Sequence, residues 1–153
     1  MEGFDLIKKI YTIGFTKKTA EEFFTLIEKN HVTKLIDIRL NNTSQLSAFS
    51  KFPDIEFFLD RICKVSYEHD IKLAPTDEIL SRYKKKEIDW HGYEIEFEQL
   101  MQSRKIDNYI ITNYSECADY CLLCSEPSPK QCHRRLVAER FAAVLKNLEV
   151  IHL

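Results

Sequence analysis

Glycine is scarce in this chain of 153 residues, where it occurs only three times. Phosphate loops and dinucleotide fingerprints each need several glycines at fixed spacing, so Gly3, Gly14 and Gly92 can form neither. No apolar run approaches the ~20 residues of a membrane-spanning helix. The first residues, "MEGFDLIKKI", lack the apolar core of a signal peptide. We therefore expect a cytoplasmic protein without membrane association.

An excess of charge of one sign is also absent. The formal net charge is −2 and the isoelectric point is about 6.2. These values exclude a protein that is basic throughout, although a local patch for nucleic acid stays open. Hydrophobic residues make up 44% of the chain and charged residues 30%, as in ordinary soluble proteins. A chain of this length suits one unit, so we expect residues 1–153 to form a single domain.

The cysteines argue against a disulfide framework. Their number is five, which is odd, and no secretion signal is present, so we expect free thiols. Cys117, Cys121 and Cys124 have the C-x3-C-x2-C spacing with which radical enzymes hold an iron–sulfur cluster. Cys121 and Cys124 fall in one predicted strand, however, where residues three apart face opposite sides. We therefore expect no cluster, and we predict burial for Cys63, Cys117 and Cys121.

Cys124, Cys132 and His133 are residue types that bind zinc. Cys132 and His133 are adjacent in the sequence, whereas zinc ligands are usually separated by intervening residues. This spacing leads us to predict no metal site. No motif in the chain points to a cofactor.

The first forty residues predict a strand, a helix and a second strand. "KKIYTIGF" is rich in β-forming residues and ends near Gly14. Thr19 and Glu22 form a capping box in front of a segment with apolar residues at helical spacing. "VTKLIDIR" is almost continuously apolar, as expected of a parallel strand covered on both faces. This order indicates a βαβ unit with a right-handed crossover.

The rest of the chain continues this alternation. We expect a polar loop at "LNNTSQLSAFSK", a helix after Pro53, a short strand in "VSYEHDIKLAP", and helices in "TDEILSRYKKK" and "YEIEFEQLMQSR", with the aromatic "DWHGY" between these two helices. "NYIITNYSECA" is ambiguous. "DYCLLCSE" predicts a buried strand, "RRLVAERFAAVLKN" an amphipathic helix and "EVIHL" a final strand. The pattern predicts an open, Rossmann-like, three-layer α/β fold with helices on both faces of a mostly parallel sheet.

Polar and reactive residues gather where three predicted strands end. In open α/β sheets, ligands bind outside the carboxyl ends of the strands. Here those ends carry Gly14, Phe15 and Thr16; Asp37 and Arg39; and Cys124, Ser125 and Glu126. We therefore predict a pocket at this edge of the sheet. Its candidate ligand-binding residues are Gly14, Thr16, Asp37, Arg39, Cys132, Arg134 and Arg135.

These strand ends also carry a resemblance to a known family. "TIGF", "LIDIR" and above all "LLCSEPSPKQCHRR" resemble, in this order, the motifs of the domain of unknown function 488 family. Members show a TIG-type strand end, a D-x-R strand end, and a cysteine–small–glutamate turn that leads to Cys-His-Arg, the CHR motif. The resemblance extends from about Tyr11 to the C-terminus. It implies an α/β fold and, as the family's name says, no settled activity.

The CHR motif begins a predicted helix, and this position favours an anion. The free N–H groups and partial positive charge of a helix start, with Arg134 and Arg135, suit a phosphate or a carboxylate. Arg39 can add a second guanidinium from a neighbouring strand end. In the alternative, these arginines pair with Asp37 and Glu126 and only brace the loop.

Cys124, Glu126 and His133 are the candidate catalytic residues. A thiol near a helix start and arginines should have a lowered pKa and be a better nucleophile. The C-x5-R signature of cysteine phosphatases is absent after both Cys124 and Cys132, which excludes the ordinary phosphatase and rhodanese loops. Glu126 and His133 can form an acid–base pair across the turn, or Glu126 can cap the helix instead.

The sequence therefore predicts a pocket for an anionic, phosphate-bearing ligand, either a nucleotide or a nucleic-acid end. Hydrolysis or group transfer is one use of such a pocket. The alternatives are a binding or regulatory module without turnover, and a nucleic-acid accessory protein. Trp90 and Tyr93 either form a lid over the pocket or belong to the core, and we expect the core. No oligomeric state follows from any motif.

Overall fold

The computed structural model describes residues 8–114 and 118–153. Its strands form one five-stranded sheet in the order β3–β2–β4–β1–β5, and every neighbouring pair is parallel. The strands are β1 (Lys8–Gly14), β2 (Lys34–Asp37), β3 (Ser66–His69), β4 (Tyr120–Cys124) and β5 (Leu148–His152). The prediction of an open α/β fold with a mostly parallel sheet is confirmed, since all five strands run in the same direction.

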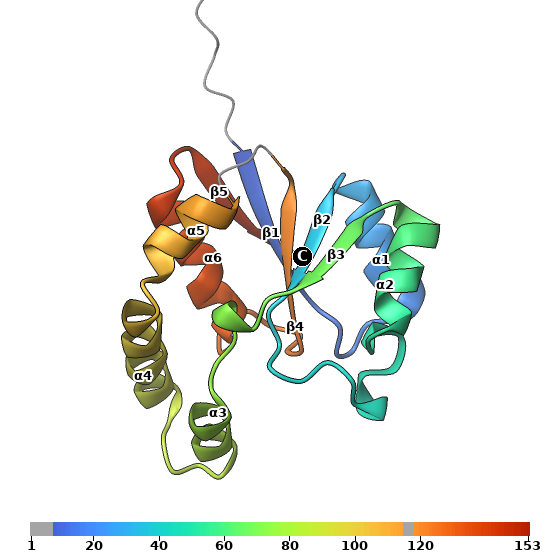
Figure 1. The fold of residues 1–153 in the computed structure, drawn as a ribbon. Coiled ribbons are helices and arrows are strands. Elements are labelled where there is room, and N and C mark those ends of the chain that lie inside the picture. The colour runs from blue at the N-terminus through green and yellow to red at the C-terminus, as the bar shows by residue number, and fades with distance from the viewer. Residues whose placement is uncertain (1–7, 115–117) are drawn as a thin grey trace, which may run out of the picture.

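One face of the sheet is covered by helices from the first half of the chain (Figure 1). They are α1 (Ala20–Lys29), α2 (Asp54–Phe58) and the π-helical continuation of α2, η2 (Leu59–Cys63). The predicted capping box of α1 is present, because Thr19 Oγ1 accepts from the Glu22 N–H and the Glu22 carboxylate accepts from the Thr19 N–H. The core on this face includes Phe23, Ile27, Leu35, Ile55, Cys121 and Leu123.

The opposite face is covered by helices from the second half of the chain (Figure 1). They are α4 (Trp90–Ser103), α5 (Ile106–Tyr114) and α6 (His133–Val144). The core on this face includes Ile10, Ile36, Phe97, Ile110, Leu122, Cys124 and Phe141. Cys121 and Cys124 thus belong to cores on opposite faces of β4, which confirms the expected strand geometry.

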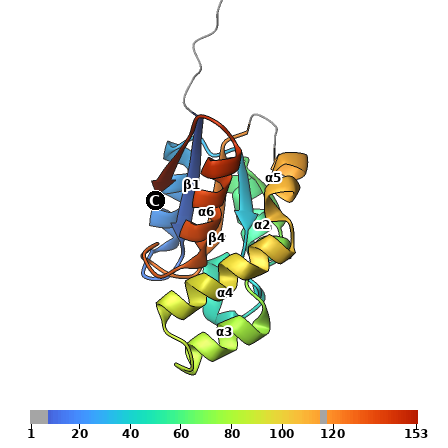
Figure 2. The ribbon, with the colours of Figure 1, turned by 90° about the vertical axis from the view of Figure 1, so that its left-hand side faces the viewer.

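The connections between strands reverse their direction between β1 and β4. The chain passes from β1 across β4 to β2, but from β4 across β1 to β5. Ligands of open α/β sheets bind at such a reversal. α3 (Asp77–Lys84) and the first turns of α4 lie beyond the carboxyl edge of the sheet (Figures 1 and 2). They therefore stand over the ends of the strands and can form a wall of a pocket.

Three segments differ from the sequence-based expectation. The expected polar loop contains a short 3-10 helix, η1 (Gln45–Ser50), because the Ser44 hydroxyl accepts the Leu46 N–H and starts it. α4 takes in most of the aromatic "DWHGY" segment, because Asp89 caps it at the Gly92 N–H, 2.8 Å away. Residues 108–114 of the ambiguous segment belong to α5, and its Cys117 lies outside the described residues.

Among helices in the described ranges, none combines the length and apolar character needed to cross a bilayer.

Candidate functional site

Gly14, at the end of β1, lies directly against the turn after β4. It pairs with Cys124 in the parallel ladder. A Cβ atom on Gly14 would lie 1.8 Å from the carbonyl oxygen of Glu126 and 2.6 Å from Arg134 Nη1. Any larger residue would push the two strand ends apart, so close packing explains this glycine.

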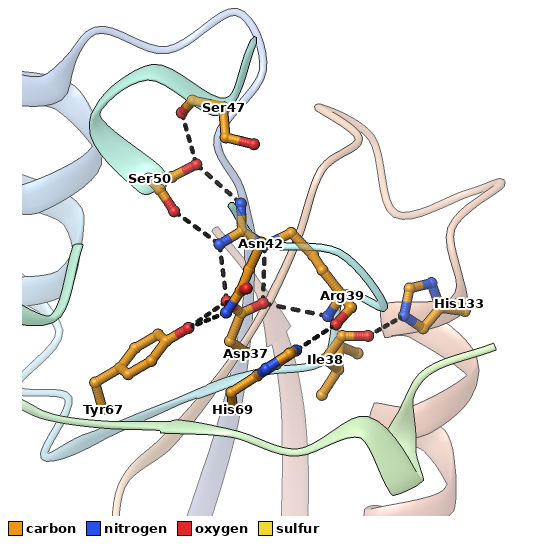
Figure 3. Close-up of polar contacts among 9 residues, drawn as sticks. All are labelled: Asp37, Ile38, Arg39, Asn42, Ser47, Ser50, Tyr67, His69 and His133. Carbon is orange, nitrogen blue, oxygen red and sulfur yellow. Dashed lines mark hydrogen bonds and ion pairs between the residues drawn. The ribbon is translucent and has the colours of Figure 1, made fainter. Parts of the chain in front are cut away.

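Asp37 and Arg39, at the end of β2, form a buried ion pair (Figure 3). Arg39 Nε and Nη2 donate to the two carboxylate oxygens of Asp37, each at 2.8 Å. Arg39 also reaches Ser50, donating from Nη2 to its carbonyl oxygen at 2.7 Å and from Nη1 to its hydroxyl at 3.0 Å. Only 3% of the Arg39 side chain and 0% of the Asp37 side chain are exposed. The pair therefore braces the loop that follows β2.

Further polar side chains complete this brace (Figure 3). The Tyr67 hydroxyl donates to Asp37 Oδ2 at 2.5 Å, and Asn42 Nδ2 donates to the Tyr67 oxygen at 2.9 Å. Burial and the charge of Asp37 raise the pKa of Tyr67, which keeps it a donor. His69 Nε2 lies 2.6 Å from the carbonyl oxygen of Arg39. The backbone from Asp37 to Arg39 is thus held from several sides.

His133, the first residue of α6, is oriented by this held backbone. Its Nε2 lies 2.7 Å from the carbonyl oxygen of Ile38 (Figure 3). A carbonyl oxygen only accepts, so Nε2 carries the proton and Nδ1 offers a lone pair. Nδ1 lies 3.5 Å from Cys124 Sγ, and Nε2 lies 3.9 Å from the same sulfur. The imidazole is therefore held beside the thiol at the end of β4, with Nδ1 as the nearer nitrogen.

Cys132 completes a cluster with Cys124 and His133. One ligand atom from each of the three residues lies within 4.8 Å of the others. The pKa of Cys124 is lowered by the hydrogen bond from Cys132, against the effect of burial, with further contributions from the Ser125 backbone and from Arg134 and Arg39. The same hydrogen bond and burial raise the pKa of Cys132. Cys124 is therefore the thiol that ionises more easily.

The cluster lines a cavity of about 320 Å³, which we call the strand-end pocket. Cys124, Cys132 and His133 are only 6%, 3% and 6% exposed, so they form its inner end. The other lining residues come from the turns after β2 and β4 and from α3 and α4, among them Arg39, Leu80, Tyr83, Lys84, Trp90, Tyr93 and Glu126. Tyr93 is buried, as expected of a core residue, yet both it and Trp90 also line this cavity.

Five of the predicted residues do not line the strand-end pocket. Gly14 and Asp37, described above, are two of them, and the other three are Arg134, Arg135 and Thr16. Arg134 is fully buried and donates from Nε to Thr12 Oγ1 at 3.2 Å and from Nη1 to the Glu126 carbonyl oxygen. Arg135 is paired at 2.8 Å with carboxylates of both Glu94 and Glu139. Thr16 is exposed, and its N–H donates to the Ser125 carbonyl oxygen at 3.2 Å. Of the three candidate arginines, Arg39 is the one that lines the pocket.

Glu126 lines the pocket through an exposed side chain. Within the described part of the chain, its carboxylate makes no hydrogen bond to His133 and does not cap α6, whose N-cap is Cys132. The Glu126 carboxylate thus neither pairs with His133 nor caps the helix, and it stays accessible to a ligand.

Two features of the site had no signal in the sequence. The contact of His133 with Ile38 joins a side chain to a backbone oxygen 95 residues earlier, and no residue pattern marks such a bond. Tyr83 and Lys84 come to the pocket because α3 lies beyond the sheet edge. The convergence of Cys124 with Cys132 did have a signal, since both flank one strand-to-helix turn.

The chain matches one model in a comparison with protein-family models. The model described as domain of unknown function DUF488 matches residues 19–141. The chain belongs to this family. The family that the sequence suggested is therefore confirmed. No curated protein matches, and no solved structure matches.

In this member of the DUF488 family, the matched range contains most of the site. It includes the Asp37–Arg39 brace and the whole CHR segment, whereas Gly14 precedes it. The CHR segment has two separate tasks here. Cys132 and His133 line the strand-end pocket, and Arg134 holds the turn after β4.

Proposed function

We propose that this protein binds an anionic, phosphate-bearing ligand in the strand-end pocket, a nucleotide or a nucleic-acid end, and hydrolyses it or transfers a group from it. Its reactive residues in this proposal are Cys124, Glu126 and His133. The observation that supports it most is the 3.5 Å contact between Cys124 Sγ and His133 Nδ1 at the inner end of the pocket. A thiol beside an imidazole that a third group orients is a reactive arrangement.

The charges around the pocket suit an anion. Lys84 and Arg39 both line it. Arg39 is paired with Asp37, whereas Lys84 forms no ion pair with any residue that the structure describes. α6 begins at Cys132, whose side chain makes no capping hydrogen bond, so the partial positive charge at the helix start adds to that of Lys84. Glu126 places a carboxylate at the same cavity, where it can take a proton from an attacking water.

Aromatic side chains favour a ligand that also carries a ring. Tyr83, Trp90 and Tyr93 line the pocket. The rings of Trp90 and Tyr93 are stacked, with centroids 4.9 Å apart and an interplanar angle of 16°. Flat aromatic surfaces of this kind hold nucleobases by stacking. A nucleotide therefore uses both the charged and the aromatic parts of the pocket.

A binding module without turnover is the second candidate. The separation of the Glu126 carboxylate from His133 favours it, because no acid–base pair is assembled among the described residues. A nucleic-acid accessory protein has less support, because Arg135 is neutralised by two glutamates and Arg134 is buried.

The proposal predicts that phosphate-bearing ligands stabilise the protein through Lys84. Melting curves are recorded with inorganic phosphate, nucleoside mono- and triphosphates, and a 5′-phosphorylated dinucleotide. We expect the nucleotides to raise the melting temperature more than phosphate does, because they add stacking. Lys84→Ala should raise the Kd by about two- to five-fold, the effect of losing one exposed charge contact.

Lys85→Ala is the matched control, because Lys85 is exposed next to Lys84 and does not line the pocket. It should leave the Kd unchanged. Chromatography of each nucleotide after incubation separates turnover from binding. If no ligand of this set changes the wild-type melting temperature, the proposed function is wrong.

A further inference from the structure

We propose that Cys124, Cys132 and His133 form a binding site for one zinc ion, with the fourth coordination position open to the strand-end pocket. The inference rests on the proposed function only for the use of that open position. The ion itself would be held by the two sulfur atoms and by His133 Nδ1. These donor types are the ones that zinc takes in proteins.

The spacing of the three donors fits one tetrahedral ion. All three side chains are buried, and one ligand atom from each lies within 4.8 Å of the others. Zn–S bonds of about 2.3 Å and Zn–N bonds of about 2.0–2.1 Å put the sulfur and nitrogen of a tetrahedral site about 3.6 Å apart. Cys124 Sγ and His133 Nδ1 are 3.5 Å apart. The separation of these two atoms therefore matches that of two ligands of one zinc ion.

The hydrogen bonding of His133 is that of a metal ligand. Histidines that bind metals usually donate their other ring nitrogen to a carboxylate or a backbone carbonyl, which fixes the tautomer. His133 donates from Nε2 to the Ile38 carbonyl oxygen at 2.7 Å. That carbonyl lies between Asp37 and Arg39, whose buried ion pair holds the backbone in place. Nδ1 is thus the ring nitrogen that is free to bind an ion, and it is the nearer of the two to the Cys124 sulfur.

Cys132 occupies a position where the local rules of helix formation favour another residue. It is the N-cap of α6, and its side chain makes no capping hydrogen bond. Serine, threonine, aspartate and asparagine are preferred there because their oxygens satisfy the free N–H groups. A residue that breaks such a rule is often retained for function. Here the Cys132 thiol is turned toward Cys124 and His133.

The same position explains how adjacent residues can bind one ion. Cys132 has an extended backbone, with φ −141° and ψ 136°, whereas His133 is the first residue of the helix. This change of conformation lets both side chains point into the same cavity, which two neighbours within a strand cannot do. The sequence-based expectation of no metal rested on their adjacency, and this geometry removes that objection.

Three protein ligands and one open position are typical of catalytic zinc, whereas structural zinc usually has four protein ligands. The open position would take a water molecule or a phosphate oxygen of the ligand. The ion lowers the pKa of bound water and polarises phosphoryl oxygens. Glu126, exposed at the same cavity, is placed to receive the proton that this water loses. With the ion bound, Cys124 and His133 would act as ligands, and the water would replace the Cys124 thiol as the nucleophile of the proposed function.

Cobalt binding tests this site without any organic ligand. The full chain is stripped of metal with a chelator, reduced and titrated with Co²⁺ while absorbance is recorded. We expect about one equivalent to bind, with thiolate-to-cobalt charge-transfer bands and tetrahedral d–d bands, and Zn²⁺ to displace it. Cys124→Ser, Cys132→Ser and His133→Asn should each weaken binding by at least about 100-fold. Cys63→Ser is the control, because Cys63 packs against the core on the opposite face of the sheet. Cys63 is only half-buried, so the prediction that it is buried is wrong.

A wild-type measurement covers the case in which a variant does not fold. The metal-free protein is alkylated with iodoacetamide, with and without Zn²⁺, and the modified cysteines are mapped by mass spectrometry. Zinc should protect Cys124 and Cys132 and leave Cys63 unprotected. Absence of charge-transfer bands in the wild-type protein, or equal protection of Cys63, would overturn the zinc site. Nucleotide binding through Lys84 is measured separately, so the proposed function can survive that result.

Discussion

At the scale of single residues, the sequence predicted a ligand-binding role for Arg134, whereas the structure gives this side chain a structural role. It is fully buried, and its hydrogen bonds go to neutral acceptors, Thr12 Oγ1 and the Glu126 carbonyl oxygen. Its Nη2 has no hydrogen-bond partner among the described residues. The sequence indicates a cation at the start of a helix. An arginine that binds an anion and an arginine that braces a turn have the same sequence pattern at this position, so the sequence does not distinguish them. The structure places Arg134 behind Gly14, against the turn after β4.

Arg134→Ala should therefore lower stability and leave nucleotide affinity nearly unchanged. We expect a loss of about 2–4 kcal/mol in the free energy of unfolding, because a large buried side chain and two hydrogen bonds are removed. Arg135→Ala is the control and should cost no more than about 1 kcal/mol, because its ion pairs are partly exposed. Urea unfolding of both variants measures this. A stable Arg134→Ala protein with weakened nucleotide binding would instead make Arg134 a ligand-binding residue.

At the scale of elements, the strands and helices that were predicted had strong local signals. The capping box of Thr19 and Glu22 and the apolar run of β2 depend on neighbouring residues only. α5 had no such signal, because "NYIITNYSECA" is rich in residues that suit either a strand or a helix. Burial of Ile110 and Tyr114 against the second core decides for the helix. Tertiary packing thus settled what propensity left open.

The contact between Thr12 on β1 and His152 on β5 leads us to predict that the stability of the protein depends on pH. Thr12 Oγ1 accepts from Arg134 Nε and lies 2.6 Å from His152 Nδ1. Burial, followed by the charge of Arg134, lowers the pKa of His152 below its ordinary value of 6.5. The unfolded chain therefore binds this proton more tightly than the folded chain does.

Because the unfolded chain binds more protons in this range, the free energy of unfolding should rise with pH. The contribution of His152 should be complete above about pH 6.5 and lost as the pH falls from there through the lower folded pKa. Urea midpoints between about pH 5 and pH 8 measure it. His152→Gln should flatten this part of the curve, and His91→Gln, at an exposed position of α4, should not. Equal curves for wild type and His152→Gln would refute the assignment.

At the scale of the whole molecule, the alternation of strands and helices was sufficient to predict the class of the fold and the edge of the sheet that carries the site. The rule that ligands bind at the carboxyl ends of parallel strands brought Gly14, Arg39 and Cys124 to one edge, where the structure has them. The wall made by Tyr83, Lys84 and Trp90 was not predictable. Its position depends on how α3 and α4 pack beyond the sheet, and no local pattern encodes that packing.

A crystal structure of the full chain grown with a nucleoside monophosphate tests the central claim most directly. We predict that the phosphate lies in the strand-end pocket, within hydrogen-bond distance of Lys84 or of the first N–H groups of α6, and that the base lies against Trp90 or Tyr93. Phosphate density at another surface, or an unchanged pocket at a saturating nucleotide concentration, would contradict the account.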